Sequence, residues 1–461
     1  MKVMSYEQKH DMMINTPVNR LIPKLAVPTI ISMLITSIYN MADTFFVSQI
    51  STSASGAVGI NFSMMAMIQA IGFTLGMGSG NFMSRRLGAK DRESAQCACS
   101  TAVYTALVLG LLLAVAGISN IDALVRLLGA TDTIAPYARD YGKYILIAAP
   151  YMTTSFVFNN HLRSQGNALQ SMIGITTGGV INCILDPILI FGFNMGISGA
   201  AIATIFSQFV SFCILLVLII RTEGVLKPHP KYFTFRLWVY KEIISAGLPT
   251  LGRQGLASAA SVLLNVMASG FGDAAVAGMS IVTRIMMFIG SALIGFGQGF
   301  QPVCGYNFGA KRYDRVLEAY YFCLKVAIVF LTLMGIVIFA VSPQLMRLFR
   351  RNDLEVIEIG ARALRLQCAA LPLQAWVIIG NMLVQSIGYS FRATLTAIGR
   401  QGLFFIPAIL TLPGMCGVLG LQLAQPVADI CTFILTQIII VQVIKELKTK
   451  SVSGNEVEIW N

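Results

Sequence analysis

Three carboxylates lie inside long apolar stretches of this 461-residue chain, where an ionised group is costly. They are Asp43, Asp186 and Asp429. An ionised Asp at the centre of a membrane helix costs about 2.5–3.5 kcal/mol on insertion scales, so each one needs a partner or a task. A carboxylate in an apolar bundle can take up a proton, or bind a hard cation together with amide and hydroxyl oxygens. The sequence therefore predicts cation chemistry at membrane depth.

Two of these carboxylates are predicted to lie at one depth in the first half of the chain. Asp43 in IYNMADTFFV and Asp186 in NCILDPILIF each come late in an apolar stretch, about 6–9 Å below the same interface. Tyr39 and Asn182 each lie one turn before a carboxylate, and Thr204 reaches a similar depth on the next stretch. Burial and a second carboxylate both disfavour the ionised form. We predict exchange of H+ here, or Na+ bound by Asp43, Asn182, Asp186 and Thr204; a structural polar network is the alternative.

Asp429 is predicted to have a structural role instead. Arg400 and Asp429 lie about fifteen and fourteen residues on either side of a hairpin turn near 413–417, which places them at one depth. Because an intramembrane charge is almost always paired, we predict an Arg400–Asp429 ion pair, with Arg284 as the alternative partner. A part for Asp429 in cation coupling stays open.

Two prolines are predicted to bend the helices that carry the first-half carboxylates. Pro28 and Pro187 each remove a backbone hydrogen bond from an apolar stretch. A bend that differs between the protonated and the ionised site would provide a two-state element. Proline is also tolerated in membrane helices for structural reasons alone, so both interpretations remain.

Twelve predicted membrane helices position these residues. The chain is 56% hydrophobic and only 12% charged, with a mean hydropathy of +0.72, which is too little charge for a soluble protein of this length. Apolar blocks recur at the length of about twenty residues that crosses about 30 Å of hydrocarbon. The predicted spans are 22–47, 57–80, 95–118, 137–157, 169–192, 197–220, 242–268, 278–301, 318–341, 359–380, 390–412 and 418–441. Residues 1–20 are polar, which does not fit a cleavable signal peptide.

The two halves of the chain form an internal repeat. LAVP ending at Pro28 matches AGLP ending at Pro249, and LGAK (87–90) matches FGAK (308–311), at an offset of 221 residues. Each half has six spans, so both enter from one side and are related by a pseudo-two-fold axis along the membrane normal. We predict an all-α membrane protein with an N-terminal lobe (1–220), a cytoplasmic linker (221–241), a C-terminal lobe (242–445) and a cytoplasmic tail (446–461). The second half does not repeat the carboxylates, since Leu264 and Pro407 occupy their positions.

The net charge of +12 is distributed as in a membrane protein rather than a nucleic-acid binder. Lys and Arg gather near both termini and in loops on one side, while the opposite loops after spans 1, 5, 7 and 11 have none. This bias predicts cytoplasmic termini in a multi-pass protein of the cell (inner) membrane. The nine cysteines form no disulfide framework and no metal set. We expect a monomer in the bilayer, with no cofactor.

Several segments resemble the multidrug and toxic compound extrusion (MATE) family, most of all its MepA-like branch. They are YNMADTFFVSQI (39–50), RSQGNALQSM (163–172), NCILDPILIFGFNMGISGAAIAT (182–204) and RQGLFFIPAILTLP (400–413). The resemblance covers about 20–445 and implies a V-shaped twelve-helix fold that exports lipophilic or cationic organic compounds against H+ or Na+.

The resemblance also implies site residues. The family's first-lobe motif, an Asp on the first helix and an Asn–Asp pair on the fifth, matches Asp43, Asn182 and Asp186, with Tyr39 and Thr204 beside them. Asn159 matches a further polar residue of that lobe. The second-lobe cation site of some members needs acids on the seventh and tenth helices, and neither predicted span has one.

Two other classes of protein remain as alternatives. A lipid-linked oligosaccharide flippase of the same wider superfamily shares the repeat, but such cavities are strongly basic. A membrane-embedded enzyme lacks support, because the chain has no HExxH or Ser-centred motif and His161 is predicted to lie in a loop.

Overall fold

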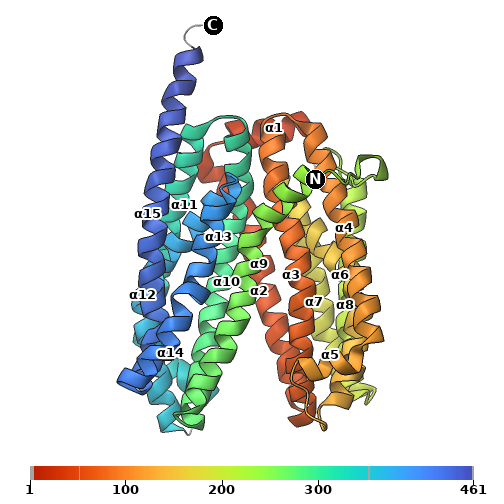
Figure 1. The fold of residues 1–461 in the computed structure, drawn as a ribbon, viewed down its shortest axis with the longest axis vertical. Helices are drawn as coiled ribbons and strands as arrows, with labels where there is room; N and C mark the ends of the chain where they lie inside the picture. Colours follow the sequence, from red (N-terminus) through yellow and green to blue (C-terminus); the bar gives the residue numbers. More distant parts are fainter. Residues whose placement is uncertain (1–4, 51, 351–352, 459–461) are drawn as a thin grey trace.

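The fold consists of long helices arranged in two lobes (Figure 1). The computed structural model describes residues 5–50, 52–350 and 353–458, and within these ranges no strand occurs. The first half contains α1 (Tyr6–Asn15), α2 (Val18–Ser48), α3 (Thr52–Gly88), α4 (Arg92–Ser119), α5 (Ile121–Leu127), α6 (Ala135–Ser164), α7 (Ala168–Pro187), the π-helix η1 (Ile188–Gly192) and α8 (Gly196–Arg221). After the short η2 (Pro230–Tyr232), the second half contains α9 (Leu237–Ser269), α10 (Asp273–Gly309), α11 (Tyr313–Phe349), α12 (Leu354–Ser386), α13 (Ser390–Ile398), the π-helix η3 (Gly399–Leu403), α14 (Phe405–Cys416) and α15 (Val418–Glu458).

Most of these helices are long and apolar enough to cross a membrane. Within the described ranges, ten spans meet that standard, and α7–η1 and α13–η3–α14 each form one of them. α6 and α9 are as long but carry more charged side chains, among them Lys143 and Arg253. With these two helices the bundle has the twelve crossings predicted from the sequence.

Two predicted boundaries differ from the helices. α8 ends at Arg221 and α9 begins at Leu237, so the connection between the halves is shorter than the predicted 221–241. α15 continues to Glu458, through most of the predicted tail, because no Pro or Gly interrupts residues 427–453. Residues 459–461 of that tail lie outside the described ranges.

The lobes pack together at the end where the N-terminus lies and separate toward the other end (Figure 1). We call the first the closed end. There, Gly78 of α3 lies against α9, and a Cβ atom at this position would be 1.9 Å from the carbonyl oxygen of Ile243. Gly299 of α10, 221 residues later, lies against α2 in the equivalent way, with its Cβ position 2.4 Å from Cα of Ala26. The repeated glycines therefore permit the close approach of the two lobes.

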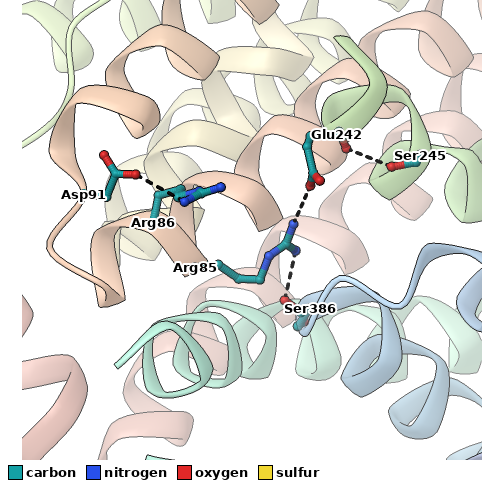
Figure 2. A network of polar contacts seen from close by, with 6 residues as sticks. All are labelled: Arg85, Arg86, Asp91, Glu242, Ser245 and Ser386. Atoms are coloured by element: carbon teal, nitrogen blue, oxygen red, sulfur yellow. Dashed lines mark hydrogen bonds and ion pairs between the residues drawn. The ribbon is translucent and has the colours of Figure 1, made fainter. Parts of the chain in front are cut away.

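Polar contacts also join the lobes at the closed end. Figure 2 shows Arg85 of α3, whose Nη2 atom is 3.3 Å from Oε2 of Glu242 in α9 and whose Nη1 donates to the Ser386 carbonyl at 3.2 Å. Arg163 of α6 donates to Gln298 Oε1 of α10 at 2.6 Å. Buried guanidinium groups thus connect the halves in this conformation.

The short helix α1 lies across the closed end and contacts both lobes. Tyr6 donates its hydroxyl to the Leu87 carbonyl of α3 at 3.0 Å. From the other lobe, Asn307 of α10 donates to the Met13 carbonyl at 3.1 Å. α1 is therefore part of the contact between the lobes.

Candidate functional site

Asp186 and its neighbours form a buried polar group inside the first lobe. α7 places Asn182 and Asp186 one turn apart, and the Asn182 amide donates to Asp186 Oδ1 at 3.2 Å. The same amide nitrogen is 3.4 Å from the Thr204 hydroxyl of α8. These three side chains are buried, with Asp186 fully shielded from solvent. The structure thus brings together the predicted residues of the fifth and sixth spans.

Asp43 reaches this group from α2. Its carboxylate lies close enough to Asp186 for the two charges to repel each other. Tyr39, one turn earlier on α2, is buried beside Asp43. Three helices therefore place both carboxylates, a phenol, an amide and a hydroxyl at one level, where the helical spacing of the sequence predicts them.

Tyr141 of α6 belongs to the same group, although the sequence analysis did not identify it. It is 1% exposed, and its hydroxyl lies within the electrostatic reach of Asp43 and Asp186. Tyr141 comes only four residues into the predicted span 137–157, which starts from the interface near both carboxylates. Depth alone would have placed it here.

Four oxygen atoms of this group have no hydrogen-bond partner among the described residues. They are Asp43 Oδ1, Tyr141 Oη, Asn182 Oδ1 and Asp186 Oδ2. Buried polar atoms are nearly always paired, so such a concentration of unpaired oxygens requires an explanation. A proton on a carboxylate, or a hard cation, would satisfy them, since such cations prefer oxygen ligands. The described part of the chain has no group of three His, Cys, Asp or Glu side chains that could hold a metal.

Two predicted residues lie away from this group. α6 carries Asn159 eighteen residues beyond Tyr141, about 27 Å along the helix, and its amide donates to Ser171 near the closed end. Pro28 is fifteen residues before Asp43, about 22 Å along α2, so it lies near the lobe contact and not beside the carboxylates. Pro187 directly follows Asp186, where α7 changes to the π-helix η1.

In the second lobe, Asp429 is paired as the hairpin geometry predicts. Its Oδ1 atom accepts a hydrogen bond from Arg400 Nε at 2.7 Å and one from Gln425 at 3.0 Å. Its Oδ2 atom accepts one from Gln374 at 2.8 Å, and the side chain is 1% exposed. Arg284, the alternative partner, is exposed on α10 and does not contact Asp429.

Comparisons with known proteins agree on one family. The family model described as MatE matches residues 28–188 and 249–410, two segments that begin 221 residues apart. The multidrug export protein MepA of Staphylococcus saprophyticus is 26% identical over 426 residues, which cover 92% of this chain and 93% of that protein. MepA of Staphylococcus haemolyticus is 27% identical over 411 residues, covering 89% and 90%.

Solved structures give the same result. A structure described as the outward-facing conformation of a multidrug resistance MATE family transporter of the MOP superfamily superposes with a TM-score of 0.90 at 25% identity, covering 97% of this chain and all of that chain. A MOP superfamily transporter from Pyrococcus furiosus, described as having a binding pocket of reverse polarity that suggests a different function, has a TM-score of 0.88 at 25% identity, with 95% and 98% covered.

Proposed function

Because the chain belongs to the MATE family of multidrug export transporters, we propose that it exports lipophilic or cationic organic compounds by antiport against H+ or Na+. The predicted family, its helical membrane fold and its transporter class are confirmed by the matches to both halves, and the chain is not an enzyme. The named relatives are multidrug exporters, so the flippase alternative is not carried further.

The group of four unpaired buried oxygens in the first lobe carries this proposal. Asp43 and Asp186 hold the coupling cation, with Asn182, Thr204 and Tyr141 as neighbouring oxygen donors. Two buried carboxylates with no basic partner cannot both stay ionised at low cost. Binding of one positive ion removes that cost, so the occupancy of the site changes the energy of the first lobe.

Alternating access follows from the arrangement of the lobes. In this conformation the lobes touch at the closed end, where both termini lie in the proposed orientation toward the cytoplasm. Export then requires the lobes to separate at the closed end and to meet at the opposite end. The cation site lies in one lobe, so it acts on this exchange through the packing of α2 and α7.

Transport by purified protein in lipid vesicles tests the proposal. A pH gradient and a Na+ gradient are imposed separately, and export of a fluorescent lipophilic cation is followed. We expect wild-type export under one of the two gradients, and a loss of roughly a hundredfold or more in Asp43→Asn and Asp186→Asn, since each removes a charge that the coupling ion neutralises.

Asp132→Asn is the matched control, because the Asp132 side chain is 95% exposed and lies on a surface connection. It should export at the wild-type rate. Equal export by wild type, Asp43→Asn and Asp186→Asn under both gradients would show that the coupling site is wrongly assigned.

A further inference from the structure

The second lobe places positive charge on the helices that correspond to the acidic ones. In the first lobe the carboxylates lie on α2 and on α7 next to the π-helix η1. The repeat relates these elements to α9 and to α13 with the π-helix η3. There the ionisable residues are Arg253 in α9 and Arg400 in η3. Equivalent helices therefore carry opposite charge in the two lobes.

Arg400 is only partly satisfied by its ion pair. Its Nε atom donates to Asp429, and that carboxylate already accepts two further hydrogen bonds from glutamine side chains. The Arg400 side chain stays 25% exposed, while Asp429 is 1% exposed. The Nη groups of Arg400 have no partner within the described residues, so one face of the guanidinium group is free for a ligand. A π-helical turn at this point is typical of functional sites.

Arg253 adds a second guanidinium group without a carboxylate of its own. It lies one turn after Thr250 and two turns before Ala260, both buried on the face of α9 that packs inside the lobe. Among the described residues it makes no ion pair and no hydrogen bond, and the Arg400 charge acts on it directly. Two arginines thus share one carboxylate, which leaves a net positive charge in a partly buried position.

This basic pair lies deeper than the acidic pair. Leu264 corresponds to Asp43, and Arg253 is eleven residues closer to the closed end, about 16 Å along α9. Pro407 corresponds to Asp186, and Arg400 is seven residues closer to the closed end, about 10 Å. The same helices, displaced in the same direction, therefore present a second and separate level of charge.

We propose that Arg253 and Arg400 form an anion-binding subsite of the second lobe, which takes the carboxylate of an amphiphilic organic anion or zwitterion. This inference rests on the proposed export function and adds a substrate class to it. A planar guanidinium group is weakly hydrated and binds a carboxylate through two parallel N–H donors, so it retains affinity in a partly buried site. The cation of the first lobe and the anionic group of the substrate then occupy different lobes.

A pair of dyes with one chromophore isolates the carboxylate. One is a rhodamine with a free carboxylate and the other is its ethyl ester, and binding to the purified full-length protein is measured by fluorescence polarisation. We expect Arg253→Gln to raise the Kd of the carboxylate dye roughly tenfold, as loss of a charge-assisted hydrogen bond predicts. The ester should change less than about twofold, because it lacks the anionic group.

Two further variants separate charge from folding. Arg253→Lys keeps the positive charge and should recover most of the affinity for the carboxylate dye. Arg362→Gln removes an arginine that is exposed on α12 of the same lobe, and it should change neither Kd. An equal change for both dyes in Arg253→Gln, or no change for the carboxylate dye, overturns the subsite.

Export in vesicles distinguishes this failure from failure of the proposed function. If wild type exports the ester while Arg253→Gln binds and exports the carboxylate dye normally, the subsite is wrong and antiport stands. If wild type binds the carboxylate dye through Arg253 but exports neither dye under either gradient, the proposed function is wrong and the subsite stands.

Discussion

An alanine at Gly78 should push the two lobes apart at the closed end. The new Cβ atom would lie 1.9 Å from the Ile243 carbonyl oxygen, whereas ordinary contact begins at 3.4 Å. α3 and α9 must therefore separate by about 1.5 Å, and overpacking of this kind costs about 1–3 kcal/mol. Only the conformation with this end closed carries the cost, so the ratio of closed to open molecules should fall roughly fivefold to 150-fold.

The reactivity of Cys304 provides the assay. This thiol is fully buried on α10, and the adjacent Gly305 packs against Ser84 of α3. Opening of the closed end exposes the thiol to a maleimide, and peptide mass spectrometry measures its labelling separately from the other cysteines. Gly78→Ala should accelerate the labelling in proportion to the population shift.

Gly59→Ala is the control for this experiment, because Gly59 lies on the same helix with nothing within 4 Å of its Cβ position. It should leave the labelling rate of Cys304 unchanged. If both variants label Cys304 at the wild-type rate, the steric argument for lobe opening fails.

Two other predictions concern single charged groups. Asp429→Asn should destabilise the protein in detergent by about 3–5 kcal/mol because it leaves a buried cation unpaired, and adding Arg400→Gln should recover about 0.5–3 kcal/mol of that loss; strictly additive effects in a denaturant series would contradict the pairing. Burial at the closed end lowers the pKa of Lys9 to about 8. Because the unfolded segment keeps its proton up to higher pH, docking of α1 should strengthen as pH rises above 8, seen as slower proteolysis near the N-terminus; Lys9→Met should lose this dependence, and an unchanged slope would refute the argument.

The sequence was sufficient for the helices, the repeat and most of the acidic group, because each depends on local features. Span length follows from apolar composition, and glycines at a constant offset report the same backbone requirement twice. Asn182 and Asp186 had to share a helix face because they are four residues apart. Asp43 required only one further step, which was its depth in the membrane.

Other features depend on packing between distant segments and were missed or misplaced. The π-helices η1 and η3 arise where a helix adapts to its neighbours, and no local motif marks them. His161 was expected in a loop, yet it is buried in the last turn of α6 with Nε2 2.7 Å from the Ser79 hydroxyl. Arg253 escaped attention because its position gains meaning only once η3 brings Arg400 beside it.

The separation of the charges between the lobes has a physical consequence. Within one lobe, Arg253 and Arg400 would pair with Asp43 and Asp186, and the carboxylates would no longer need a cation. At about 10 Å and an effective dielectric constant near 20, a single attraction is still about 1.7 kcal/mol, enough to weaken cation binding more than tenfold. Duplication of the backbone, with opposite charges on equivalent helices of different lobes, keeps both sites unsatisfied. Each lobe therefore retains an unmet demand for a ligand of opposite sign.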